Sequence, residues 1–117
     1  MNKYSIGVTV TPATETTLLT VPTGYCAVVS LAFISNHSGN NKTFSMWWEH
    51  SHDVGHAIYI IDGKTFSLSE FLQFSGAEIV LQEGDTLKVL TEAASDFSVI
   101  ITFELVPAPT SRIVFPD

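Results

Sequence analysis

The sequence has 117 residues, of which 45% are hydrophobic and only 15% are charged. This length suits one domain, and eight Phe with so few charges exclude an intrinsically disordered chain. Five Lys and Arg against 12 Asp and Glu give a formal net charge of −7. The acidic balance excludes nucleic acid and an anionic membrane surface as partners. The low charge also indicates that a partner protein covers part of the apolar surface.

The single cysteine, Cys26, excludes an internal disulfide and a cysteine-based metal site. Because it lies in an apolar segment, we expect its thiol to behave as a small hydrophobic group and not as a nucleophile. The first residues lack the apolar segment of a signal peptide, and no apolar run is long enough for a transmembrane helix.

The dominant hydrophobic period is two residues, which is typical of strands. Short runs rich in Val, Ile, Thr and Phe alternate with turn-forming Gly, Pro, Asn and Asp. The pattern predicts nine strands, at residues 4–10, 16–21, 25–36, 42–52, 56–62, 65–74, 78–82, 86–91 and 97–105.

Turn residues separate these strands. Residues 21–24 place Pro and Gly where a tight turn needs them, and residues 36–41 form a polar loop. Asp62 and Gly63 are a hairpin dipeptide, and residues 83–85 form another turn. Residues 92–95 are long enough for a helical turn, but their length suits a loop better.

Alternation predicts which side chains face the core. In the last strand, Phe97, Val99, Ile101, Phe103 and Leu105 share the inner face. In residues 42–52, the inner face carries Phe44, Met46 and Trp48, and then His50 and His52. One buried face and one polar face are typical of antiparallel sheets.

Two segments, residues 26–34 and residues 57–61 with Tyr59 among them, are apolar on both faces. Such strands need cover on both sides. Two explanations remain open, namely a central strand covered by a terminal segment or loop, and a strand in a subunit interface.

Together these features predict an all-β fold, an antiparallel β-sandwich of jelly-roll type over residues 1–105. Residues 106–117 differ, because Pro107 and Pro109 favour extended backbone and cannot donate ladder hydrogen bonds. The apolar residues Ile113, Val114 and Phe115 follow. We interpret residues 106–117 as an extended C-terminal arm that docks on another subunit; a disordered end is the alternative.

Histidines are the first candidates for chemistry. His50 and His52 lie two positions apart on one strand face, so they could share a metal ion with His56 or Asp53 as a third ligand. No fourth ligand at a suitable spacing accompanies them, and the simpler interpretation is a polar loop rim. The sequence also lacks a nucleophile elbow, a distinctive carboxylate pair and a phosphate-binding loop. We therefore expect no enzyme activity, no cofactor and no metal.

The pair Trp47–Trp48 is more informative, because adjacent strand residues point to opposite faces. Alternation places Trp48 in the core and Trp47 on the outer face. An outward tryptophan anchors a protein interface, lies under the protein's own tail or stacks on a sugar ring. The expected interface residues are Trp47, Tyr59, Ile113, Val114 and Phe115.

Four segments resemble motifs of small structural proteins of tailed bacteriophages. They are TLLTVPTGYCAVV at residues 17–29, ISNHSG at 34–39, IVLQEGDTLKV at 79–89 and DFSVIITFEL at 96–105. Each motif alone is weak, because any β-sandwich could carry it, but their order and spacing are more specific. The segment from His50 to His56 and the Pro-containing arm depart from the family's pattern.

The resemblance implies a non-enzymatic virion protein, assembled in the cytoplasm of the bacterial host. The favoured role is a capsid decoration or cement protein that binds the major capsid protein or other virion proteins. By analogy with such proteins, we expect a homo-oligomer, with a trimer favoured. Alternatives are a head–tail or tail-associated protein and a host-glycan-binding module.

Overall fold

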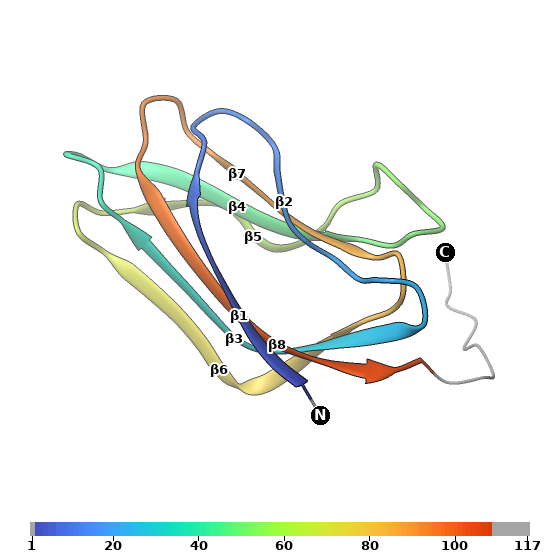
Figure 1. Cartoon of the computed structure of the whole chain (residues 1–117). Helices are drawn as coiled ribbons and strands as arrows, with labels where there is room; N and C mark the ends of the chain where they lie inside the picture. Colours follow the sequence, from blue (N-terminus) through green and yellow to red (C-terminus); the bar gives the residue numbers. More distant parts are fainter. Residues whose placement is uncertain (1, 109–117) are drawn as a thin grey trace.

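Segments in which β-branched and aromatic residues alternate with polar ones form the strands of this chain. The computed structural model describes residues 2–108, and these residues form eight strands (Figure 1). The strands are β1 (Asn2–Val10), β2 (Thr16–Thr20), β3 (Tyr25–Asn36), β4 (Lys42–Glu49), β5 (Ile58–Phe66), β6 (Phe71–Leu81), β7 (Thr86–Thr91) and β8 (Phe97–Pro107). No helix in this part of the chain has the length and apolarity needed to cross a membrane.

The strands form two four-stranded antiparallel sheets that face each other (Figure 1). The first sheet has the order β1-β8-β3-β6, and the second sheet has the order β2-β7-β4-β5. Eight strands that alternate between two sheets in this order are a jelly roll. The predicted fold class is therefore confirmed.

The core lies between the two sheets. Phe44, Phe66 and Phe97 are completely buried, and their ring centroids lie 5.2 to 5.7 Å apart. Along β8, the alternate residues from Phe97 to Phe103 are buried, as the pattern predicts. Cys26 is also buried, at 8% exposure.

The prediction of three strands between residues 56 and 82 was wrong, because two strands, β5 and β6, occupy this stretch. Asp62 and Gly63 form no hairpin. They lie within β5, opposite Ser45 of β4, where the register shifts. Gly63 has a φ of +64°, and its N–H donates to the Ser45 hydroxyl at 2.8 Å. The dipeptide therefore makes a β-bulge, because Gly supplies the positive φ that some bulges and some tight turns both use.

The two doubly apolar segments occupy different positions. Residues 26–34 belong to β3, which lies between β8 and β6, so the central-strand interpretation is confirmed for them. Residues 58–61 belong to β5, which is an edge strand of the second sheet. Ile58 and Tyr59 are therefore exposed, at 38% and 51%. A central position was the wrong explanation for this segment.

A buried amide joins three loops at one end of the sandwich. The side chain of Asn36, 1% exposed, donates to the carbonyl oxygens of Asn40, Phe66 and Ser67 and accepts from the N–H of Ser38. The Ser38 hydroxyl in turn accepts from the N–H of Asp96 at 2.7 Å. The turn at residues 36–39 thus ties β3 to the loops before β6 and β8.

Candidate interaction surfaces

The outer face of the second sheet carries an ionic network around a buried carboxylate. Glu49, 5% exposed, accepts from the indole N–H of Trp47 at 2.9 Å and from the N–H of Gly55 at 3.1 Å. The ammonium of Lys88 lies 3.3 Å from Glu49 and 3.0 Å from Glu15. Strand geometry explains the grouping, because Trp47 and Glu49 are two positions apart in β4 and Lys88 pairs with Trp47.

This network fixes the charges of its members. The hydrogen bond from Trp47, followed by those from Gly55 and Lys88, lowers the pKa of Glu49 below its ordinary value. The hydrogen bond to Glu15, followed by the one to Glu49, raises the pKa of Lys88. A general base needs a pKa near the operating pH, whereas these hydrogen bonds shift the pKa of Glu49 away from neutral pH. The arrangement is suited to structure and not to proton transfer.

The two tryptophans lie on the predicted faces, but their burial is the reverse of what those faces suggest. Alternation assigned the faces correctly, because Trp48 packs against the core and Trp47 lies outside the core cluster. However, Trp47 is only 5% exposed, with its ring 5.7 Å from that of Tyr59. Trp48 lies near the end of β4 and is partly buried. Sequence reasoning missed the role of Glu49; the available signal was its place two positions after Trp47 on the same strand face, whereas Lys88 lies in another strand.

A second buried carboxylate anchors the end of β4. Asp85, 2% exposed, accepts hydrogen bonds from the indole N–H of Trp48 at 3.1 Å and from the N–H groups of Ser51 and Gln82. The neighbouring Gly84 has a φ of +81°, and a Cβ added there would lie 2.8 Å from Ser51 Cβ. The close approach needs a glycine, so residues 84 and 85 fasten the turn before β7 to the loop after β4.

The histidine segment lies mostly in that loop and not in a strand. The His50 ring lies 4.6 Å from the Trp48 ring and 5.0 Å from the His52 ring, and His56 contacts Asp53 at 3.4 Å. Within residues 2–108, no three His, Cys, Asp or Glu side chains are grouped as metal ligands would be. In the part of the chain that the structure describes, His50 and His52 thus lie together without a third side chain grouped as a ligand.

The outer face of the first sheet carries exposed apolar side chains among polar ones such as Thr102 and Glu104. We call this patch, made of Phe33, Phe71, Val80 and Ile100, the outer apolar face. Phe71 is 61% exposed, Val80 50% and Ile100 41%. Phe33 stacks on Phe71 with centroids 5.4 Å apart and pairs with Ile100 of β8. Phe33, Phe71 and Ile100 are neighbours, whereas Val80 lies further along the sheet, opposite Val28. Exposed apolar side chains that gather on one sheet face are typical of a surface that binds another protein.

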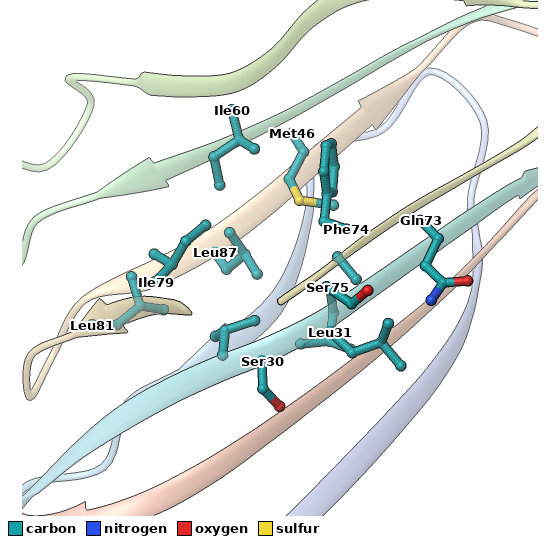
Figure 2. A pocket seen from close by; sticks show the side chains of 13 residues that line it. Ser30, Leu31, Met46, Ile60, Gln73, Phe74, Ser75, Ile79, Leu81 and Leu87 are labelled. Atoms are coloured by element: carbon teal, nitrogen blue, oxygen red, sulfur yellow. The ribbon is translucent and has the colours of Figure 1, made fainter. Parts of the chain in front are cut away.

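A cavity of about 350 Å³ lies between the two sheets. Figure 2 shows Ile60, Met46 and Leu87 of the second sheet across from Ser30 and Leu31 of the first. Residues of the edge strand β6, Gln73 to Ser75, border it and are exposed. The cavity is therefore open to solvent beside β6.

Of the predicted interface residues, Tyr59 is exposed on the edge strand β5 and Trp47 is covered. Ile113, Val114 and Phe115 lie outside the described residues. The end of the described chain stays in the first sheet, because Pro107 pairs with Tyr25 and the N–H of Ala108 donates to Gly24 O at 2.9 Å.

No family model matches the chain, and no curated protein matches it. One solved structure is similar, a chain described under "Bacillus endospore appendages form a novel family of disulfide-linked pili". The TM-score is 0.52 at 15% sequence identity, over 87% of this chain and 82% of that chain. At this identity, the likeness establishes a shared fold.

Proposed function

We propose that this protein is a non-enzymatic structural subunit that assembles with other protein subunits through the outer apolar face. The observation that carries the proposal is the exposure of Phe71, Val80 and Ile100 on one sheet face. Burying them in a contact gains hydrophobic free energy of roughly 25 cal/mol for each Å² removed from water. The network around Glu49 also supports a structural role, because it holds the carboxylate ionised and covered.

The specific form that we favour is a capsid decoration protein of a tailed bacteriophage, which binds the major capsid protein and associates with itself, preferably as a trimer. The order and spacing of the four sequence motifs support this form. A head–tail or tail-associated protein would carry the same surfaces. A host-glycan module has less support, since Trp47, its proposed sugar platform, is covered by the chain itself.

The fold shared with a pilus subunit supports a second candidate, a subunit of an extracellular filament. We do not expect these 117 residues to form the disulfide links between subunits that the description of the pilus names. A chain of covalent links needs at least two cysteines per subunit, whereas this sequence has Cys26 alone, which is buried. A filament of these subunits would be held by non-covalent contacts.

Quantitative mass spectrometry of purified assemblies tests the proposal. A decoration protein is expected in fixed stoichiometry with a capsid protein, and its removal should lower the stability of the particle. A filament subunit is expected as the main component of a fibre. Recovery of the protein only as a free monomer, in no assembly, would contradict both forms.

A further inference from the structure

The edge strands of the two sheets differ in regularity. β1 and β6 are the edges of the first sheet, and β2 and β5 are the edges of the second (Figure 1). The register shifts at Leu18 in β2, at residues 76–78 in β6 and at Gly63 in β5. Such bulges disturb an edge and protect it from pairing with another strand. β1 carries no shift, because Asn2–Val10 pairs with β8 residue by residue.

Charged side chains also protect the other long edges. β5 carries Asp62 and Lys64, and β6 carries Glu78. In β1 the charged side chain is Lys3, near the start of the strand. Charge and irregularity are the usual devices that keep a free edge from pairing. Among the strands that the structure describes, β1 is therefore the long edge that lacks both devices along most of its length.

The hydrogen bonds of β8 show the direction of its backbone groups. The N–H of Ala108 donates to the carbonyl of Gly24, which directly precedes β3. The carbonyl of Thr102 accepts from the hydroxyl of Ser30 in β3 at 3.5 Å. Because backbone groups alternate in direction along a strand, the even-numbered residues of β8 face β3 and the odd-numbered residues face β1.

This alternation identifies the backbone groups of β1 that point away from the sheet. The residues opposite even-numbered residues of β8 are Lys3, Ser5, Gly7 and Thr9. Their N–H and C=O groups point away from β8, and we call this row the open edge. All of these residues are exposed. A row of backbone donors and acceptors directed outward is a template for another strand.

We propose that β1 pairs with β1 of a second copy, antiparallel, about a two-fold axis at Ile6. In this register Lys3 lies opposite Thr9 of the second copy, and Ser5 lies opposite Gly7. Every residue of the open edge then exchanges hydrogen bonds with another residue of an open edge. No like charges face each other across the axis, since each lysine lies opposite a threonine.

The side chains of β1 argue for a second copy over an unrelated strand. In the same register, Tyr4 lies opposite Val8 of the second copy, and Ile6 lies opposite Ile6. Tyr4 is 42% exposed, and Ile6 and Val8 are half-buried, so the pairing removes apolar surface from water. Aromatic and β-branched pairs across strands stabilise a sheet. Polar residues thus meet small or polar ones on one face, and apolar residues meet apolar ones on the other.

This contact goes beyond the proposed function, because it does not use the outer apolar face. A two-fold axis perpendicular to the sheet keeps the outer apolar faces of both copies on the same side. The pair would present the face twice, and two linked contacts bind a larger assembly more tightly than one. Analogy with decoration proteins favours a trimer, whereas the open edge favours a dimer. The mass of the oligomer decides between them.

Light scattering tests the contact in a full-length chain with a disabled outer apolar face. The double variant Phe71→Ser, Ile100→Ser removes two side chains of that face and should still form a dimer. Adding Gly7→Pro removes an N–H of the open edge without removing a hydrogen bond to β8. It should weaken dimerisation by about ten- to a hundredfold. Gly7→Ala, whose Cβ would meet nothing within 4 Å, keeps the N–H and is the matched control that should remain a dimer.

Circular dichroism shows whether the subunit with Gly7→Pro is folded. If it is not, Ser5→Lys with Gly7→Lys replaces it, because these exposed positions face each other across the axis and like charges there oppose pairing. A folded variant of either kind that remains a dimer would overturn the inference. A monomer or a trimer of the double variant Phe71→Ser, Ile100→Ser would overturn it too, while leaving assembly through the outer apolar face intact.

Disulfide trapping in the otherwise wild-type chain tests the register. Cys26 is buried, so a cysteine introduced on the exposed face of β1 is the accessible thiol. The Ser5→Cys and Gly7→Cys variants, mixed and oxidised, should form a linked dimer, because opposite bonded residues lie about 5.5 Å apart. Neither variant alone should link, since equal positions of the two copies lie more than about 7 Å apart. Absence of linking in the mixture, or equal linking in one variant alone, would overturn the inference. A wild-type chain that stays monomeric and joins no assembly would reject the proposed function as well.

Discussion

The indole N–H of Trp47 donates a hydrogen bond of 2.9 Å to Oε2 of Glu49, two positions further along β4. Both side chains lie on the outer face of the second sheet, yet each is only 5% exposed. The pair shows that an outward-facing residue of a sheet is not necessarily accessible. Here Lys88 of the neighbouring strand and Gly55 of the following loop complete the contacts of Glu49.

Trp47→Phe tests the contribution of this hydrogen bond. The substitution keeps an aromatic ring but leaves the covered carboxylate with one donor fewer, so we expect a loss of about 1–3 kcal/mol in the free energy of unfolding. Tyr59→Phe, which removes an exposed hydroxyl, is the control and should change stability by less than about 0.5 kcal/mol. Urea denaturation measures both, and equal small effects would show that the bond contributes little.

The free energy of unfolding should decrease in acid, because Glu49 becomes protonated. Its pKa is lower in the folded chain than the ordinary value, so its contribution is fully present above the pKa of the unfolded chain and is lost as pH falls through the folded pKa. The urea midpoint should therefore decline as the pH is taken below about 4.5, the ordinary value for Glu.

Glu49→Gln isolates this contribution from those of other carboxylates. Glu70, for example, also has a lowered pKa, because it accepts from the N–H of Ser67. The stability difference between wild type and the variant should shrink in acid. A difference that stays constant from neutral pH to well below the ordinary pKa of Glu would contradict the assignment.

Asn36→Ala should be among the most damaging polar substitutions. The amide satisfies the carbonyl oxygens of three residues and the N–H of Ser38, and each buried group left unpaired costs about 1–3 kcal/mol. Asn40→Ala, at an exposed position in the same loop, is the matched control and should cost less than about 0.5 kcal/mol. Equal effects in thermal unfolding would reject the role of Asn36 as an anchor.

Substitution by alanine should destabilise the protein to different extents at Gly63 and at Gly84, because the space around the two glycines differs. Gly63 has positive φ but open space around it, so Gly63→Ala should cost about 1 kcal/mol through backbone strain alone. In Gly84→Ala the same strain is joined by a Cβ that would lie 2.8 Å from Ser51 Cβ. Denaturant unfolding should rank Gly84→Ala as clearly worse, and the opposite ranking would contradict the close approach of the two loops.

The sequence predicts most of the strands and the fold class, because alternation along β8 reports directly on burial and alternation along β4 reports which face each side chain takes. Prediction from the sequence fails where one local pattern is compatible with two different structures. Asp62–Gly63 suits a hairpin and a bulge equally, and only the pairing of β5 with β4 decides between them. The exposure of Trp47 likewise depends on Glu49 and on side chains from other elements, which periodicity does not reveal.

The motifs that suggested a phage protein have structural explanations. Asn36 and Ser38 join loops, and Gly84 and Asp85 fasten the turn before β7 to the loop after β4. Such residues are needed by the fold whatever assembly it serves. The resemblance therefore supports the jelly roll more strongly than it supports one particular virion component.

Light scattering of the full-length protein across micromolar concentrations tests the central claim, assembly through the outer apolar face, most directly. The account predicts an oligomer for the wild-type chain and a much smaller species for the double variant Phe71→Ser, Ile100→Ser, because these side chains are 61% and 41% exposed in the single subunit. Val54→Ser serves as the exposed apolar control and should assemble as the wild type does. A wild-type chain that remains a monodisperse monomer, or a folded double variant with the wild-type mass, would contradict the account.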